Sequence, residues 1–253
     1  MNTTTATDWI DIDQLAPLGD AEIWRLARTE YVRMLALLRS VDDADWSKQT
    51  DCAAWTVRDL LGHLVGAAEG FSNPLQFLHQ YRVGARFIAQ GRTDGKQPVD
   101  GANAVQVAER SHLSVEQLLG RYEAVIEPTL RWRRRLRHLP VRLQDVAGAF
   151  TFRELFQIIL TRDTWIHRID ISRAIGKPIE MTADHDGRFT ADMVRDWASR
   201  FQSPFLLRLT GVAGGAYRRR EGGEMLELTA VEFARLLSGR GKGDGLLSSR
   251  IVF

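Results

Sequence analysis

The chain has 253 residues and is 44% hydrophobic and 26% charged, a composition typical of a soluble globular protein with one large domain or two small ones. Its net charge of +2 is too small to indicate a nucleic-acid-binding protein by itself. The single cysteine, Cys52, excludes an intrachain disulfide and a multi-cysteine zinc site and fits a reducing cytosol, so we expect a cytoplasmic protein.

The N-terminal segment is polar and acidic, and it lacks the cationic stretch and apolar run of a signal peptide. We therefore expect no signal peptide. Apolar runs elsewhere fall short of the roughly 18 residues that a membrane-spanning helix needs. We also expect no membrane partner.

The first 178 residues carry the apolar periodicity of amphipathic helices. An apolar stripe predicts a helix over 20–41, and Pro74 predicts the start of another over 73–91. Each of three further helices opens with a capping box: Thr56 and Asp59 in 55–72, Ser114 and Gln117 in 114–139, and Thr151 and Glu154 in 151–176. The polar residues 92–112 predict a loop or a broken helix. Four main antiparallel helices predict a bundle.

After Gly176 the pattern changes to short segments separated by glycine-rich turns. The patterns there predict a helix over 184–202, strands over 205–211 and 224–229, a capped helix over 229–240 and a last strand over 248–253. The predicted fold class is therefore α+β, with a helical bundle in residues 1–178 followed by a small α+β C-terminal domain in residues 179–253.

Two residues of the 151–176 helix, Asp163 and His167, are four apart and therefore lie on one helix face. A carboxylate and an imidazole there can share a cation, but catalytic zinc sites use three protein ligands. His63 is the candidate third ligand, because it lies in an apolar helix and is expected to face a neighbouring helix. From these residues alone, a core histidine and a surface Asp–His pair remain the more ordinary interpretations.

Two motifs carry a family resemblance. The run DCAAWTVRDLLGHLVG (51–66) resembles the opening motif of the mycothiol-dependent maleylpyruvate isomerase family, a branch of the DinB-like superfamily, and TRDTWIHRIDISRAIGKP (161–178) resembles its second motif. The segments RLTGVAGGAY, LELTAVEFARLLSGR and GDGLLSSRIVF resemble the C-terminal domain of actinobacterial members. The resemblance implies a DinB-like four-helix bundle, a divalent metal held by His63, Asp163 and His167, and mycothiol as thiol cosubstrate.

One position departs from the family pattern, which has glutamate where this chain has Asp163. Aspartate is one methylene shorter, so the change puts tight zinc binding and the parent isomerase reaction in doubt. We expect zinc, although two imidazoles and one carboxylate also suit nickel, iron or manganese.

The implied chemistry is addition of a metal-bound thiolate to a small electrophilic substrate, which gives cis–trans isomerisation or S-transfer. Arg240 matches an arginine of the family's C-terminal domain and is expected to bind a substrate carboxylate as a catalytic residue, although a solvated arginine at a helix end is the alternative. Asp170 is a candidate for a structural contact or for orienting a ligand. An ion pair of Arg168 and Asp170 on the helix surface, or a contact at a domain interface, is the simpler interpretation. Cys52 is expected to be a small buried residue rather than the nucleophile.

Two other functions compete with this one. The substitution at Asp163 favours, as an alternative, a catalytically idle or regulatory metal-binding member of the family. The run RWRRRLRH has five arginines between 131 and 137, which could bind phosphates. Consecutive arginines wrap around a helix instead of sharing a face, so we expect no nucleic-acid partner. The expected partners are a small electrophile and a low-molecular-weight thiol, bound by a monomer or homodimer.

Overall fold

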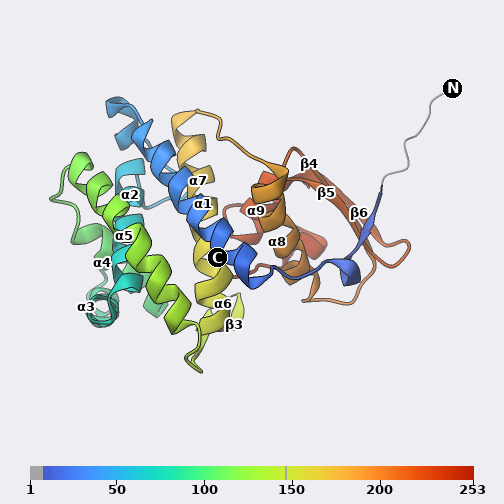
Figure 1. Ribbon diagram of the computed structural model, residues 1–253, viewed down its shortest axis with the longest axis horizontal. Helices are drawn as coiled ribbons and strands as arrows, with labels where there is room; N and C mark the ends of the chain where they lie inside the picture. Colours follow the sequence, from blue (N-terminus) through green and yellow to red (C-terminus); the bar gives the residue numbers. More distant parts are fainter. Residues whose placement is uncertain (1–7, 146) are drawn as a thin grey trace. The chain divides into compact units, whose positions relative to one another are not determined.

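The computed structural model describes residues 8–145 and 147–253 (Figure 1). Residues 1–7, part of the segment for which no signal peptide is expected, lie outside the described residues. Contacts between residues divide the chain into two compact units. The helical unit is Ile23–Ile179, and the sheet unit combines Glu180–Phe253 with the chain up to Glu22.

The helical unit is built mainly from long helices (Figure 1). Its elements are α1 (Asp20–Arg39, from Ile23 on), the 3-10 turn η2 (Asp43–Ser47), α2 (Val57–Ser72), α3 (Pro74–Ala89), α4 (Pro98–Ala108), α5 (Val115–Leu136), the antiparallel hairpin β2 (Arg142–Asp145) and β3 (Gly148–Thr151), α6 (Phe152–Glu154), the π turn η3 (Leu155–Ile159) and α7 (Leu160–Ile175). The three predicted capping boxes form at the start of α2, α5 and α6, so these helices begin where the sequence places them.

Apolar stripes on these helices form the core of the helical unit. Leu26, Met34 and Leu38 of α1 are fully buried, as the predicted stripe requires. The stripe also carries Glu30, whose carboxylate accepts hydrogen bonds from the Arg168 guanidinium of α7 at 2.6 and 3.2 Å. This ion pair joins α1 to α7 inside the core.

The segment 92–112 differs from its prediction as a loop or broken helix, because it contains the regular helix α4. The close packing of α4 against α3 explains the helix. A Cβ atom on Gly101 would lie 2.5 Å from the Gly84 carbonyl oxygen, so the two backbones touch where glycine leaves room. Packing therefore stabilises a helix whose sequence is weakly amphipathic.

Replacing Gly101 by alanine is expected to lower the free energy of unfolding by about 1–3 kcal/mol, because the added methyl forces the α3 and α4 backbones apart. Gly120→Ala is the matched control, since a Cβ there meets nothing within 4 Å on the exposed side of α5. That change is expected to be neutral or to stabilise by up to about 1 kcal/mol. Urea denaturation measures both, and equal effects would contradict the packing argument.

The sheet unit is a small mixed sheet with helices. Its elements are β1 (Ile10–Asp11), the 3-10 turn η1 (Ile12–Gln14), the π turn η4 (Ala183–Gly187), α8 (Arg188–Ala198), β4 (Phe205–Thr210), β5 (Gly215–Arg219), β6 (Glu224–Thr229), α9 (Ala230–Leu237) and the 3-10 turn η5 (Gly245–Ser248). The strand order is β1-β5-β4-β6, in which β4 runs antiparallel to β5 and parallel to β6, and β1 runs parallel to β5. Trp197 of α8 is fully buried against Phe205 of β4 and Phe233 of α9.

The predicted last strand over 248–253 is wrong. Residues 245–248 form η5, and no strand follows in the described residues up to Phe253. Ile251 and Val252 are nevertheless buried, and the Ile251 amide donates to the Leu237 carbonyl at the end of α9. The apolar residues that suggested a strand therefore pack against α9 without joining the sheet.

The predicted α+β class, a helical bundle followed by a small α+β region, is confirmed. The division into domains at residues 178 and 179 stays a prediction. That prediction did not include a strand at β1, which precedes the helical unit in the sequence. Ile10 pairs with Tyr217 of β5, so a strand from the first residues of the chain joins the C-terminal sheet. Among the described residues, no helix is long and apolar enough to cross a membrane.

Candidate metal centre

His63 lies on the second turn of α2, whose start is fixed by Thr56 and Asp59. The Asp59 amide donates to the Thr56 hydroxyl at 3.2 Å, and the Thr56 amide donates to the Asp59 carboxylate at 3.1 Å. This capping box fixes the residue at which α2 begins. The His63 side chain then points into the bundle, where it is 4% exposed.

Asp163 and His167 lie one turn apart on α7, directly after the π turn η3. A π turn inserts an extra residue and so rotates the face that the following helix presents. Arg133 of α5, which is fully buried, donates to the Phe156 carbonyl in η3 at 2.9 Å and to the Thr161 hydroxyl at 2.6 Å. The buried guanidinium therefore holds the turn that orients Asp163 and His167.

The structure brings His63, Asp163 and His167 together, with one ligand atom of each within 4.8 Å of the others. The Nε2 atom of His167 lies 3.3 Å from Oδ1 of Asp163, and Nε2 of His63 lies 4.0 Å from Oδ2. Donor atoms of a tetrahedral zinc site lie about 3.4 Å apart, given zinc bonds of roughly 2.0–2.2 Å. The carboxylate of Asp163 therefore lies near both imidazoles, with a different oxygen toward each.

Both imidazoles are anchored through Nδ1. His63 Nδ1 bonds the Gln106 side-chain oxygen at 2.8 Å, and His167 Nδ1 bonds the Asp170 carboxylate at 2.9 Å. In a neutral imidazole, an oxygen acceptor on Nδ1 selects the tautomer with the hydrogen there and leaves Nε2 with a lone pair. His63 is neutral, whereas His167 offers its lone pair only after it loses a proton. Both Nε2 atoms then face Asp163.

His63 Nε2 is buried and has no hydrogen-bond partner among the described residues, since 4.0 Å is too long for a bond to Asp163. A buried acceptor left unpaired costs stability unless another group satisfies it. The Nε2 atoms of His63 and of deprotonated His167, together with the Asp163 carboxylate, form a donor set that fits a divalent cation.

The charges of the cluster are coupled. Burial opposes ionisation of Asp163, but His167 and then His63 lower the pKa of its carboxyl well below the ordinary value. Burial also disfavours the charged form of His167, yet Asp163 and then Asp170 raise the pKa of this imidazole well above 6.5. Burial lowers the pKa of His63, which keeps this imidazole neutral and able to bind a cation.

Solvent reaches the cluster at Asp163. Its side chain is 28% exposed, compared with 6% for His63 and 5% for His167. Trp55 stacks on the His63 ring with the ring centroids 4.7 Å apart and covers that side. An exogenous ligand would therefore approach along the carboxylate.

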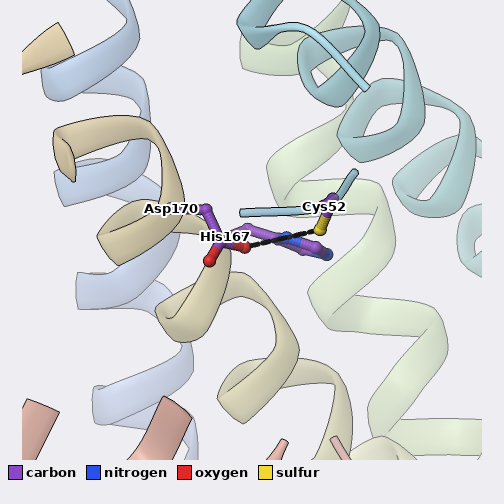
Figure 2. A group of neighbouring side chains, drawn as sticks. All are labelled: Cys52, His167 and Asp170. Carbon is purple, nitrogen blue, oxygen red and sulfur yellow. Dashed lines mark hydrogen bonds and ion pairs between the residues drawn. The ribbon is translucent and has the colours of Figure 1, made fainter. Parts of the chain in front are cut away.

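The loop before α2 places Cys52 beside His167 and Asp170 (Figure 2). The Cys52 sulfur lies 3.6 Å from Asp170 Oδ2 and 3.9 Å from His167 Nδ1. These three residues could also surround a metal ion. We favour the His63–Asp163–His167 cluster, because the 2.9 Å contact between His167 Nδ1 and Asp170 is a hydrogen bond that needs no ion.

Two sequence-based interpretations near the cluster change. The expected surface ion pair of Arg168 and Asp170 is wrong, because both side chains are buried and Arg168 pairs with Glu30. The sequence analysis also missed that Cys52 contacts the candidate ligand His167. The available signal was the position of Cys52 in the motif over 51–66, which carries the family resemblance. Arg240 follows α9 in the sheet unit, where its amide donates to the Arg235 carbonyl at 2.8 Å, and its role stays a prediction.

The family model of the mycothiol maleylpyruvate isomerase N-terminal domain matches residues 27–172, more than half of the chain. The chain belongs to this family. The match includes His63, Asp163 and His167 and both motifs apart from the last residues of the second.

Two solved structures of mycothiol-dependent maleylpyruvate isomerase share the fold. One is 19% identical and covers 93% of this chain and 94% of its own, with a TM-score of 0.54. The other, a histidine-to-alanine variant, is 17% identical, covers 92% of both chains and has the same TM-score of 0.54. No curated protein sequence matches the chain.

Proposed function

We propose that the protein is a metal-dependent and mycothiol-dependent enzyme that adds a thiolate to a small electrophilic substrate. The observation that carries the proposal is the buried, unpaired Nε2 atom of His63, which faces Asp163 and His167 in a member of this family. His63, Asp163 and His167 would hold the ion, with zinc favoured and nickel, iron or manganese compatible with the same donors.

When bound, a divalent ion supplies one chemical advantage, because it favours thiolate over thiol at neutral pH. The sulfur of the thiol would form a C–S bond to the electrophilic carbon while the C=C electron pair moves toward an adjacent carbonyl. Rotation about the former double bond and return of the electron pair would break the C–S bond, release the thiolate and leave the isomerised product. If the adduct instead takes up a proton and is released, the result is S-transfer.

The chain's own residues define the approach to the cluster. Trp55 excludes water from the His63 side, and the exposed side of Asp163 leaves room for the thiol and substrate. Arg240 is proposed to bind a substrate carboxylate, for which its planar guanidinium is suited. A cytoplasmic location and a monomeric or homodimeric state are part of the proposal.

The arginine run over 131–137, at the end of α5, supports the absence of a nucleic-acid partner in this proposal. Arg133 is buried in the core, and the Arg134 and Arg137 guanidinium groups lie 5.1 and 5.3 Å from the centre of the Trp24 ring. These side chains therefore pack against the protein and do not form one phosphate-binding strip.

Metal analysis of the purified protein tests the proposal. The wild type and His79→Ala, a control at an exposed histidine paired with Glu109, are expected to hold about one divalent ion per chain. His63→Ala and His167→Ala are expected to lose it. Equal metal content in all four proteins, or none after loading with zinc, would contradict the proposed site.

Turnover separates the two reaction outcomes. Maleylpyruvate and mycothiol are the first probes, because both appear in the names of the related structures. Isomerisation returns the thiol unchanged, whereas S-transfer consumes one thiol for each product, so a thiol assay beside product analysis distinguishes them. A fully metal-loaded enzyme that turns over no electrophile with any thiol would favour the idle or regulatory alternative.

A further inference from the structure

The buried side chains of His63, Gln106 and Gln80, from three helices, form a chain of hydrogen bonds, called the relay below. His63 of α2 bonds Gln106 of α4 at 2.8 Å, Gln106 bonds Gln80 of α3 at 3.0 Å, and Gln80 bonds the Gly66 carbonyl of α2 at 2.8 Å. These three side chains belong to residues that are at most 4% exposed. The relay therefore leaves α2 at His63 and returns to it at Gly66, one turn later.

The Gly66 carbonyl fixes the direction of the relay. A carbonyl oxygen can only accept, so Gln80 must offer its amide Nε2 there and its Oε1 to Gln106. Gln106 then donates its own Nε2 to Gln80 and presents Oε1 to His63. An oxygen at this position requires a hydrogen on His63 Nδ1, which leaves the Nε2 lone pair directed at Asp163.

Glycines make room for the relay. A Cβ atom on Gly66 would lie 2.6 Å from Cβ of Gln106, and one on Gly70 would lie 2.7 Å from Oε1 of Gln80. Arg110 holds the other end of Gln106, because its guanidinium donates to the Gln106 backbone carbonyl at 2.9 Å and is paired with Glu69. Backbone and side chain of Gln106 are thus both fixed.

We propose that Gln106, oriented by Gln80 and the Gly66 carbonyl, is a positioning residue that keeps His63 in the tautomer able to bind a metal through Nε2. This inference rests on the proposed metal site. The two imidazoles of the cluster are then held differently, since His167 is backed by the Asp170 carboxylate and His63 by a neutral amide. Residues that support metal ligands in this way typically contribute about 10–100-fold to metal affinity.

The test compares Gln106→Met with Gln106→Glu. Methionine keeps the approximate volume but offers no oxygen to Nδ1–H, and it is expected to weaken zinc binding about 10–100-fold. Glutamate keeps the acceptor toward His63 but loses the hydrogen bond to Gln80, so it is expected to bind zinc more tightly than Gln106→Met and less tightly than the wild type. Gly66→Ala displaces the Gln106 side chain without changing its chemistry, so it is also expected to weaken zinc binding. This variant replaces Gln106→Met in the test if Gln106→Met does not fold.

The second readout is the tautomer of His63 in the metal-free protein, measured by 15N NMR of labelled histidines and assigned by comparison with His63→Ala. The wild type and Gln106→Glu are expected to show hydrogen on Nδ1, and Gln106→Met a mixture of tautomers. Wild-type tautomer and zinc affinity in Gln106→Met would overturn the inference. If the wild type binds no zinc but its tautomer still depends on Gln106, the proposed function fails while the positioning of His63 stands.

Discussion

Replacing Glu30 by alanine is expected to lower the free energy of unfolding by about 3–5 kcal/mol, because it takes the carboxylate from a buried arginine. The Arg168 guanidinium is 2% exposed and makes two hydrogen bonds to Glu30, which is fully buried. A charge left in the core without this partner keeps its desolvation cost and loses the attraction that offsets it. Chemical denaturation of the metal-free protein measures the loss without a contribution from bound metal.

The matched control replaces both partners, as Glu30→Met with Arg168→Met. Replacing a buried ion pair by apolar side chains of similar volume is often neutral, so the double variant is expected to recover most of the lost stability. A double variant as unstable as Glu30→Ala would show that volume or other contacts, and not the unpaired charge, dominate at this position.

Replacing Asp163 by asparagine is expected to weaken zinc binding by more than the roughly 10–100-fold typical of supporting residues, because it removes the anionic ligand. The change is also expected to alter the pH dependence. In the metal-free wild type, burial opposes a charge on His167, but Asp163 raises the pKa of this imidazole well above 6.5. Zinc must therefore displace a proton, and the observed affinity rises with pH up to the pKa of His167.

In Asp163→Asn the desolvation of His167 remains while its largest attractive partner is gone, so the pKa of His167 falls. The rise in zinc affinity is then expected to end at a lower pH than in the wild type. Zinc titration against a competing chelator, on both sides of neutral pH, measures this. Asp163→Glu, which restores the family's residue, is expected to bind zinc with a wild-type pH profile. Identical profiles for all three proteins would contradict the coupling between Asp163 and His167.

Local sequence features predicted where the helices begin and which residues share a helix face. Capping residues such as Thr56 and Ser114 determine where a helix begins through bonds within one turn, so their effect can be read from the sequence. The spacing of Asp163 and His167 likewise predicted that they share a face. Their proximity to His63 came from the family resemblance and from the expectation that His63 faces a neighbouring helix.

Features that depend on distant parts of the chain escaped prediction. Gln106 lies in the segment expected to be a loop or broken helix, and its bond to His63 exists because α2, α3 and α4 pack together. Cys52 reaches Asp170 only through the folded bundle. Strand β5 has the sequence GAYRR, which lacks the alternation of apolar and polar residues that indicates a strand. Strand β1 has two residues, which is too short to show such a pattern.

The pairing of β1 with β5 has a consequence for protein synthesis. A ribosome releases the chain from its N-terminus, and compact units generally fold as they emerge. Ile10 emerges before the helical unit, whereas its partner Tyr217 emerges only after all of Ile23–Ile179. The helical unit can therefore fold before β1 has its partner, and this edge of the sheet forms only after β5 has emerged. A two-residue strand exposes few backbone groups during that interval, which limits its capacity to pair with another nascent chain.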